Sequence, residues 1–273
     1  MDKALRDEPL WTPSPDGIAS ALVSDFMRQV NDRHGVALGD YAALHRWSVD
    51  HLEAFWTAVW DFGGVIAEKR GERVLIDGDK MPGARFFPDA RLNFAENLLR
   101  TGDDSDAIVF RGEDKVRRRL SHRELNDAVS RMQQALAESG VGAGDRVAAF
   151  MPNMPETVIA MLATASLGAT FTSCSPDFGI QGVLDRFGQV EPKVLFCCDG
   201  YYYNGKVVET LPRIAQVAAQ LPTLARVVVV PYISEAPDVS AVPHALRLAD
   251  FVAPFAARAV QYRRMPFNHP LYI

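Results

Sequence analysis

The sequence predicts an α/β fold: part of a doubly wound, mostly parallel sheet flanked by helices, preceded by a small helical N-terminal segment. Residues 146–178 run in the order apolar stretch, helical repeat, apolar stretch, and two further apolar stretches follow at 193–198 and 226–230. Strands that alternate with helices in this way form βαβ units, whose strands are parallel. Before the first of these strands, apolar residues have helical spacing over residues 18–30 and again over residues 49–59.

Composition limits the class of protein. The chain has 273 residues, 48% hydrophobic and 23% charged, which is ordinary for a soluble protein with a buried core. A net charge of −5 argues against a nucleic-acid partner. The charged N-terminus and the lack of a long apolar run predict neither a signal peptide nor a membrane span. Three cysteines inside apolar runs are typical of a reduced, cytoplasmic protein; they are Cys174, Cys197 and Cys198.

The N-terminal segment is predicted to hold two helices after an extended arm over residues 1–16. Ser14 is the expected N-cap of the first helix, which ends at Gly35. One face of that helix is marked by Ile18, Leu22, Phe26 and Val30. A connector over residues 41–47 leads to a second helix, which begins at Ser48. A short helix over 93–99 precedes the polar loop 102–106, which suggests domains 1–100 and 101–273.

The α/β part opens with a hairpin and a long helix. Short runs at 108–111 and 115–120 flank a turn, and three arginines of the second run indicate a solvated face rather than a phosphate site. Ser121 and Glu124 form a capping box that begins the helix. The glycine-rich stretch 140–145 follows a helix and precedes a strand, the reverse of a dinucleotide-binding loop, so it predicts a turn.

The central unit is a strand over 146–151, a helix over 155–167 ended by Gly168, and a strand over 170–174. Ligands of such sheets bind at the carboxyl ends of the strands, where the loops 152–155 and 175–179 are expected.

Downstream, Asp177 is the expected cap of a helix over 178–190. A strand over 193–198 leads into a loop over 199–206, and Thr210 begins the next helix. After the strand 226–230, residues 231–245 are expected to form a proline-rich loop.

Catalytic motifs are absent from the sequence. The six histidines are scattered without a metal-ligand spacing, and there is no nucleophile elbow, Walker loop or carboxylate pair. The loop 201–206 offers a lysine for a phosphate, a glycine for close backbone approach and tyrosines for a base, a combination also found in surface loops without a specific role.

Three segments resemble the adenylate-forming acyl-CoA synthetases. Residues 121–178 are similar to the superfamily in general, and 84–99 with the tryptophan-rich helices before it are similar to the N-terminal segment of acetyl-CoA and acetoacetyl-CoA synthetases. Residues 172–178, TSCSPDF, resemble the acetoacetyl branch. The resemblance extends from about Trp11 onward and is most specific over 84–200.

This resemblance implies an ATP-dependent ligase that uses Mg²⁺, converts acetoacetate to an acyl-adenylate and passes the acyl group to CoA, in ketone body and lipid metabolism. Residues 101–273 would be the first part of its AMP-binding domain, with acetoacetate, ATP and CoA as partners and neither nucleic acid nor membrane. The family's phosphate loop follows a strand similar to Pro270–Ile273, where the sequence stops. No catalytic, ATP-binding or metal-binding residue is therefore assigned, and the 273-residue chain alone is expected to be inactive.

One site is carried over from the resemblance. In the family, a basic turn after the strand equivalent to 193–198 contacts the CoA nucleotide, and one of its two basic positions holds tyrosine here. The expected contacts are Tyr203, Asn204, Gly205 and Lys206, with Ser175 and Pro176 beside the same nucleotide. Three alternatives remain open: another short-chain acyl-CoA synthetase, a non-catalytic module that binds a nucleotide or a partner, and a nucleotide-dependent oxidoreductase.

Overall fold

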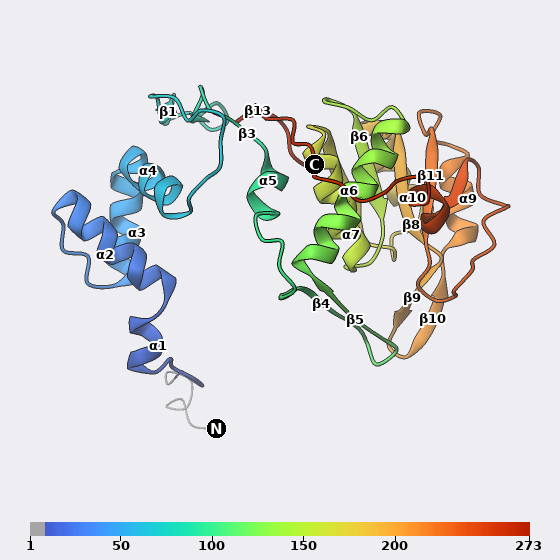
Figure 1. The fold of residues 1–273 in the computed structure, drawn as a ribbon, viewed down its shortest axis with the longest axis horizontal. Helices are drawn as coiled ribbons and strands as arrows, with labels where there is room; N and C mark the ends of the chain where they lie inside the picture. Colours follow the sequence, from blue (N-terminus) through green and yellow to red (C-terminus); the bar gives the residue numbers. More distant parts are fainter. Residues whose placement is uncertain (1–8) are drawn as a thin grey trace. The chain divides into compact units, whose positions relative to one another are not determined.

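The computed structural model describes residues 9–273, so the first half of the expected N-terminal arm lies outside the described residues. Two compact units make up the chain (Figure 1). Unit 1 comprises Met1–Val65 with Arg73–Ala84, and unit 2 comprises Ile66–Glu72 with Arg85–Ile273.

Unit 1 is helical. Its elements are α1 (Pro15–Ala19), α2 (Leu22–His34), α3 (Tyr41–Asp50), α4 (Leu52–Phe62) and the short strand β1 (Leu75–Ile76). Ser14 caps α1 as expected, because its hydroxyl accepts a hydrogen bond from the N–H of Gly17 at 3.1 Å. Gly35 ends α2 in the left-handed region, at φ 64°. The core of this unit is formed by Phe26, Val30, Leu44, Trp47 and Ala58.

Three predictions for unit 1 are wrong. The single helix expected before Gly35 is broken at Ser20, where the chain leaves the helix and then starts α2. The second helix does not begin at Ser48, which lies inside α3; the chain breaks at His51 and α4 begins at Leu52. The expected connector over residues 41–47 is instead the first part of helix α3. The side chain of Asp40 accepts a hydrogen bond from the N–H of Ala43 at 2.7 Å, which satisfies a backbone group that would otherwise be orphaned at the helix start.

Unit 2 contains the parallel sheet and its helices. In chain order its elements are β2 (Arg85–Phe86), β3 (Arg91–Leu92), α5 (Phe94–Leu98), β4 (Asp106–Gly112), β5 (Val116–Ser121), α6 (His122–Glu138), β6 (Arg146–Phe150), α7 (Pro155–Ser166), β7 (Thr170–Cys174), α8 (Ile180–Val190), β8 (Val194–Cys198), β9 (Gly200–Tyr203), β10 (Lys206–Glu209), α9 (Leu211–Ala218), β11 (Arg226–Val230), β12 (Ala245–Arg247), α10 (Leu248–Val252) and β13 (Met265–Pro266).

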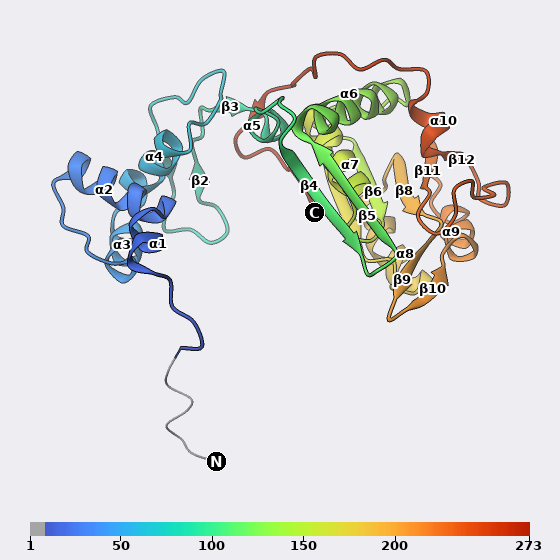
Figure 2. The same ribbon diagram turned by 60° about the horizontal axis from the view of Figure 1, so that its bottom comes forward.

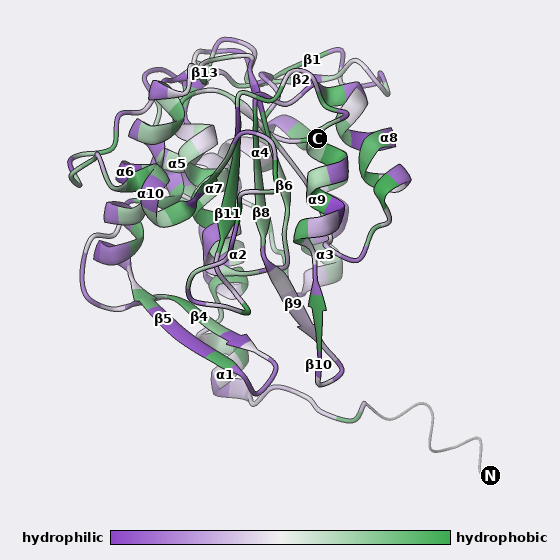
Figure 3. Ribbon diagram, turned by 90° about the vertical axis from the view of Figure 1, so that its right-hand side faces the viewer, coloured by the Kyte–Doolittle hydropathy of each residue, from purple (hydrophilic) through white to green (hydrophobic). Residues whose placement is uncertain are grey.

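The main sheet has five strands in the order β12-β11-β8-β6-β7, and every pairing within it is parallel. Helices cover both faces, as the fold class predicts (Figure 2). Alternate residues of β6 divide between the two sides. Val147 and Ala149 pack with α6, α7 and α10, whereas Ala148 and Phe150 pack with α8 and α9. The central strands β6, β8 and β11 are therefore apolar on both faces, and Figure 3 shows them mostly in the hydrophobic colour.

The outer edge of β7 is bordered by the end of the chain. The N–H of Phe171 donates to the carbonyl of Leu271 at 3.0 Å, and the N–H of Ile273 donates to the carbonyl of Phe171 at 2.9 Å. Between α10 and this edge, residues 253–265 run as a strap over α6 and α7. Its backbone is held by side chains beneath it, among them Gln133, whose Oε1 accepts from the N–H of Gln261 at 3.1 Å.

Most predicted features of unit 2 are confirmed, including the capping box at Ser121 and the left-handed Gly168 after α7. Three predictions are wrong. Helix α8 begins at Ile180 with Gly179 as its N-cap, so Asp177 does not cap it. The loop expected over 199–206 contains the hairpin β9–β10, and the loop expected over 231–245 runs into β12.

Candidate functional site

The order of the strands locates the crevice where a ligand is expected. From β6 the chain adds β7 on one side, and then β8, β11 and β12 on the other. The connections therefore diverge between β6 and β8, and ligands of doubly wound sheets bind at such a switch point, outside the carboxyl ends of the strands. The segments that leave these two ends are residues 151–154 and the hairpin β9–β10.

The hairpin β9–β10 carries four of the six predicted site residues. Tyr203 and Lys206 pair across it, with Asn204 and Gly205 as the two turn residues. Both turn residues have positive φ, 50° and 73°, which is the type I′ geometry that favours Asn-Gly. The turn thus aligns backbone N–H groups and a lysine at the end of a rigid ribbon.

The predicted side chains of this hairpin are available to a ligand. Tyr203 is 70% exposed, and Lys206 is exposed as well. Among the described residues 9–273, Lys206 makes no ion pair. The N–H of Gly205, in contrast, is occupied: it donates to Oε2 of Glu113 at 3.0 Å. Glu113 lies in the β4–β5 turn, so the tips of two hairpins meet here, as Figures 1 and 2 show.

The other two predicted residues follow β7. Ser175 is exposed and Pro176 is buried. No hydrogen bond or ion pair between described residues connects them to the β9–β10 turn. Both groups nevertheless follow parallel strands of one sheet, so they lie at the same edge of it.

Two arginines that the sequence did not single out flank the loop after β7. Nη1 of Arg213, on α9, donates to the carbonyl of Phe178 at 3.2 Å. The guanidinium of Arg186, on α8, lies 4.3 Å from the centre of the Phe178 ring. Neither arginine belongs to a motif, and only the packing of α8 and α9 brings them to this edge. They add positive charge on the side of Ser175, which favours an anionic ligand.

An aromatic cluster supports the two hairpins. Tyr232 lies between Tyr202 and Phe110, at ring-centre distances of 5.3 Å and 6.1 Å. Burial, with a smaller effect of the neighbouring Tyr202, raises the pKa of Tyr232. The Tyr232 hydroxyl also approaches Gly112 so closely that a Cβ there would lie 2.1 Å from it. The cluster therefore fixes β4–β5 against β9–β10.

Asp199 organises the segment that follows β11. Its buried carboxylate accepts hydrogen bonds from the backbone N–H groups of Tyr232, Ile233 and Ser234, at 2.7, 3.1 and 2.9 Å, and from the Ser234 hydroxyl at 3.0 Å. These four hydrogen bonds occupy both carboxylate oxygens, and all of them come from the protein itself. Asp199 is therefore a structural residue beside the site.

The cysteines offer no reactive group. Burial raises the pKa of Cys174 to about 12, and burial likewise raises the pKa of Cys198 to about 12. Both thiols are therefore protonated at neutral pH and are poor nucleophiles. Within residues 9–273, no group of three or more His, Cys, Asp or Glu side chains is placed to hold a metal ion. The same residues include no helix with the length and apolar character that a bilayer crossing requires.

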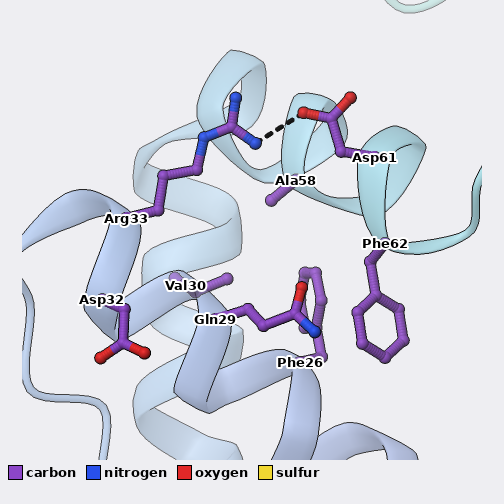
Figure 4. Close-up of a pocket in the computed structure, with 8 residues that line it drawn as sticks. All are labelled: Phe26, Gln29, Val30, Asp32, Arg33, Ala58, Asp61 and Phe62. Carbon is purple, nitrogen blue, oxygen red and sulfur yellow. Dashed lines mark hydrogen bonds and ion pairs between the residues drawn. The ribbon is translucent and has the colours of Figure 1, made fainter.

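Unit 1 has a hollow of its own, of about 370 Å³ between α2 and α4 (Figure 4). Phe26, Val30 and Phe62 provide an apolar floor. At its rim the guanidinium of Arg33 pairs with Asp61 at 2.5 Å. The ion pair neutralises the charge of Arg33. The other polar side chains of the lining, Gln29 and Asp32, do not point toward a common position. We assign no ligand to this hollow.

Comparison with known proteins adds two family matches. The profile of the AMP-binding enzyme family matches residues 94–259, and that of the acetyl-coenzyme A synthetase N-terminus matches residues 41–98.

Individual relatives are similar along nearly the whole chain. Acetoacetyl-coenzyme A synthetase of Rhizobium meliloti (strain 1021) is 53% identical over 98% of this chain and 41% of its own length. Acetoacetyl-CoA synthetase of Xenopus tropicalis is 35% identical over 100% of this chain and 42% of its own. The solved acetoacetyl-CoA synthetase from Streptomyces lividans has a TM-score of 0.87 and 42% identity over 97% of this chain and 41% of its own. The chain thus spans about two-fifths of the length of these relatives.

Proposed function

Because the chain belongs to the AMP-binding enzyme family, we propose that the whole protein is an ATP-dependent acid–thiol ligase that converts acetoacetate and CoA to acetoacetyl-CoA. The acid first forms an acyl-adenylate with release of pyrophosphate, and the acyl group then passes to the CoA thiol. The observation that carries the proposal is the similarity to acetoacetyl-CoA synthetases along nearly the entire chain.

Within that enzyme, residues 1–100 are the N-terminal segment and residues 101–273 are the first part of the AMP-binding domain. The two family matches support this division, because they meet between residues 94 and 98. We assign no ATP, Mg²⁺ or catalytic contact to the described residues. None of their turns is a loop rich in serine, threonine and glycine that ends in lysine.

The part of the reaction assigned to this chain is the binding of the CoA nucleotide. Lys206 supplies a cation that makes no ion pair with any of residues 9–273, and the type I′ turn supplies backbone donors, a combination that suits a phosphate. Tyr203 offers a ring face at the same turn. Ser175 and Pro176 border the nucleotide from the end of β7, where Arg186 and Arg213 make the surroundings positive.

The proposal is tested with the full-length protein. Carboxylate-dependent exchange of pyrophosphate into ATP measures the first half-reaction, and formation of AMP on addition of CoA measures the second. We expect both activities, with acetoacetate preferred over acetate and butyrate. Exchange that no carboxylate stimulates would contradict the ligase, and a preference for acetate would assign the protein to the acetyl branch.

A second measurement concerns the 273-residue chain by itself. Calorimetric titration with MgATP should give no heat of binding at micromolar affinity, because the described residues provide no phosphate loop. A micromolar site would show that these residues bind the nucleotide in another way. Titration with NADH under the same conditions tests the oxidoreductase alternative, for which we expect no binding.

A further inference from the structure

The contact between the two hairpin tips joins residues that are far apart in the sequence. Glu113 and Gly205 are separated by 92 positions, and a hydrogen bond of 3.0 Å connects the carboxylate of one to the backbone N–H of the other. Both residues are exposed. The bond therefore lies at the surface, at the turn to which the proposed function assigns the CoA phosphate.

The turn that donates this bond does not depend on it. Asn204 and Gly205 occupy the left-handed region, in which Asn-Gly is the preferred pair of a two-residue hairpin. Ladder pairing from Lys206–Tyr203 to Glu209–Gly200 closes the ribbon behind the turn. Contact with Glu113 is therefore an addition to a turn that is already formed.

The residue that accepts the bond is held in a costly conformation. Glu113 has φ 49°, in a region that few residues other than glycine occupy. Glycine would adopt this conformation without strain. Strained backbone of this kind is found at functional positions more often than elsewhere. A glutamate at this position therefore costs conformational energy that glycine would not. The hydrogen bond that its carboxylate accepts from the Gly205 N–H indicates a functional role.

The scaffold keeps the two tips together independently of that bond. Packing of Phe110 and Tyr202 against Tyr232 fixes the bases of the two hairpins. The close approach of Tyr232 to Gly112 holds the β4–β5 turn next to them. Glu113 is therefore presented to the β9–β10 turn in the absence of any ligand.

A carboxylate resembles a phosphate in the two properties that matter here. Both carry negative charge, and both accept hydrogen bonds from backbone N–H groups and from lysine. We propose that Glu113 is an internal competitor for the CoA phosphate: it occupies the Gly205 N–H in the free protein and is displaced when the nucleotide binds beside Lys206. This inference rests on the proposed function, because it takes the β9–β10 turn as the CoA site. The consequence is a CoA affinity below the maximum that the turn could provide, which favours release of the product.

The experiment uses Glu113→Gln in the full-length protein, with Asp114→Asn as the matched control. Both substitutions remove one negative charge from the same exposed turn, but the carboxylate of Asp114 contacts Lys115 and not Gly205. We expect Glu113→Gln to lower the KM for CoA about fivefold, because a hydrogen bond to a charged acceptor is stronger than one to a neutral amide. Asp114→Asn should change the KM for CoA less than about twofold. Pyrophosphate exchange should be unchanged in both variants.

Two further variants separate the possible outcomes. Glu113→Gly removes the acceptor of the Gly205 N–H without straining the turn. This variant should lower the KM for CoA at least as much as Glu113→Gln. Lys206→Ala tests the site itself. If Lys206→Ala leaves the KM for CoA unchanged, the site assignment fails and the competitor role with it. If Lys206→Ala raises the KM but the Glu113 variants match Asp114→Asn, or raise the KM themselves, the site stands and competition by Glu113 is overturned.

Discussion

The two edges of the parallel sheet use their charged residues in opposite ways. At the amino edge the chain satisfies them itself. Lys193 pairs with Asp145 at 2.9 Å and donates to the carbonyl of Gly140 at 2.7 Å. Arg146 donates to the carbonyls of Val190 and Glu191 at 2.6 Å and 2.9 Å. These groups bind the turns before β6 and β8 to one another.

At the carboxyl edge, by contrast, Lys206 and Ser175 are exposed, and Arg186 and Arg213 face the loop after β7 rather than a carboxylate. Lys206, which makes no ion pair with any of residues 9–273, is available for an anion. Arg186 and Arg213 donate to the carbonyls of Gly182 and Phe178 and add positive charge nearby. The difference indicates that the amino edge serves stability and the carboxyl edge serves binding.

Asp199 is the exception at the carboxyl edge, and its removal should have the largest effect. Asp199→Ala leaves three backbone N–H groups near Tyr232 without their acceptor. We expect the free energy of unfolding to fall by about 3 kcal/mol, measured by urea denaturation. Asp238→Ala is the control, because this exposed aspartate has Ser240 as its one hydrogen-bond partner within residues 9–273. A loss below about 1 kcal/mol for Asp199→Ala would show that water replaces the carboxylate.

Lys206→Ala should have the next largest effect, on binding rather than on stability. The KM for CoA should rise about tenfold, equivalent to about 1.4 kcal/mol, because a charge-assisted contact to phosphate is lost. Pyrophosphate exchange and the unfolding midpoint should not change. Lys115→Ala, which removes an exposed lysine from the facing hairpin, is the matched control. Equal loss in both half-reactions would remove the assignment of Lys206 to CoA.

Asp145→Asn probes the amino edge and should affect stability alone. Burial acts to raise the pKa of Asp145, but hydrogen bonds from Lys193 and the Gly142 N–H outweigh it and hold the pKa below its usual value. The ion pair therefore stabilises the fold at pH values above the unfolded pKa of about 3.9, and this stability is lost as the pH falls through the lower folded value.

In unfolding experiments at pH 7, Asp145→Asn should cost about 1 kcal/mol, and the cost should shrink toward pH 3. The KM for CoA should be that of the unaltered protein. A cost that does not vary with pH would mean that packing, and not charge, connects Asp145 to Lys193.

Ser175→Ala should have the smallest effect. One hydroxyl at the border of the nucleotide is expected to change the KM for CoA about twofold, the effect of a single neutral hydrogen bond. Ser173→Ala, two residues earlier on the exposed side of β7, is the control and should leave the KM unchanged. If the two variants behave alike, the end of β7 does not contact the nucleotide.

Periodicity and turn chemistry predict four of the five strands of the main sheet and most of its helices, but not β12. The runs that become β6, β8 and β11 are apolar on both faces, as strands covered by helices on both sides require. Local sequence signals fail to predict the structure of short segments whose residues are compatible with either a loop or a strand. The Asn204-Gly205 pair is a strong hairpin signal, but the two short strands that flank it lie outside the main sheet, and the prediction of a loop over 199–206 does not include them.

The site could be predicted only in part. A resemblance located the β9–β10 turn, but the partner of its Gly205 N–H lies on another hairpin, and no local pattern connects them. Arg186 and Arg213 are ordinary helix residues in the sequence, and only the packing of α8 and α9 brings them to Phe178. Contacts of this kind depend on tertiary structure, which periodicity does not describe.

The border of β7 has a consequence during synthesis. The residues that cover this edge lie about 100 positions after it, as the contact from Thr170 to Pro270 shows. At translation rates of roughly 5 to 20 residues per second, a nascent chain presents an open strand edge for roughly 5 to 20 s. An uncovered edge is a template on which strands of other chains can add. We therefore expect the nascent chain to depend on chaperones during the interval between the synthesis of β7 and the synthesis of Leu271.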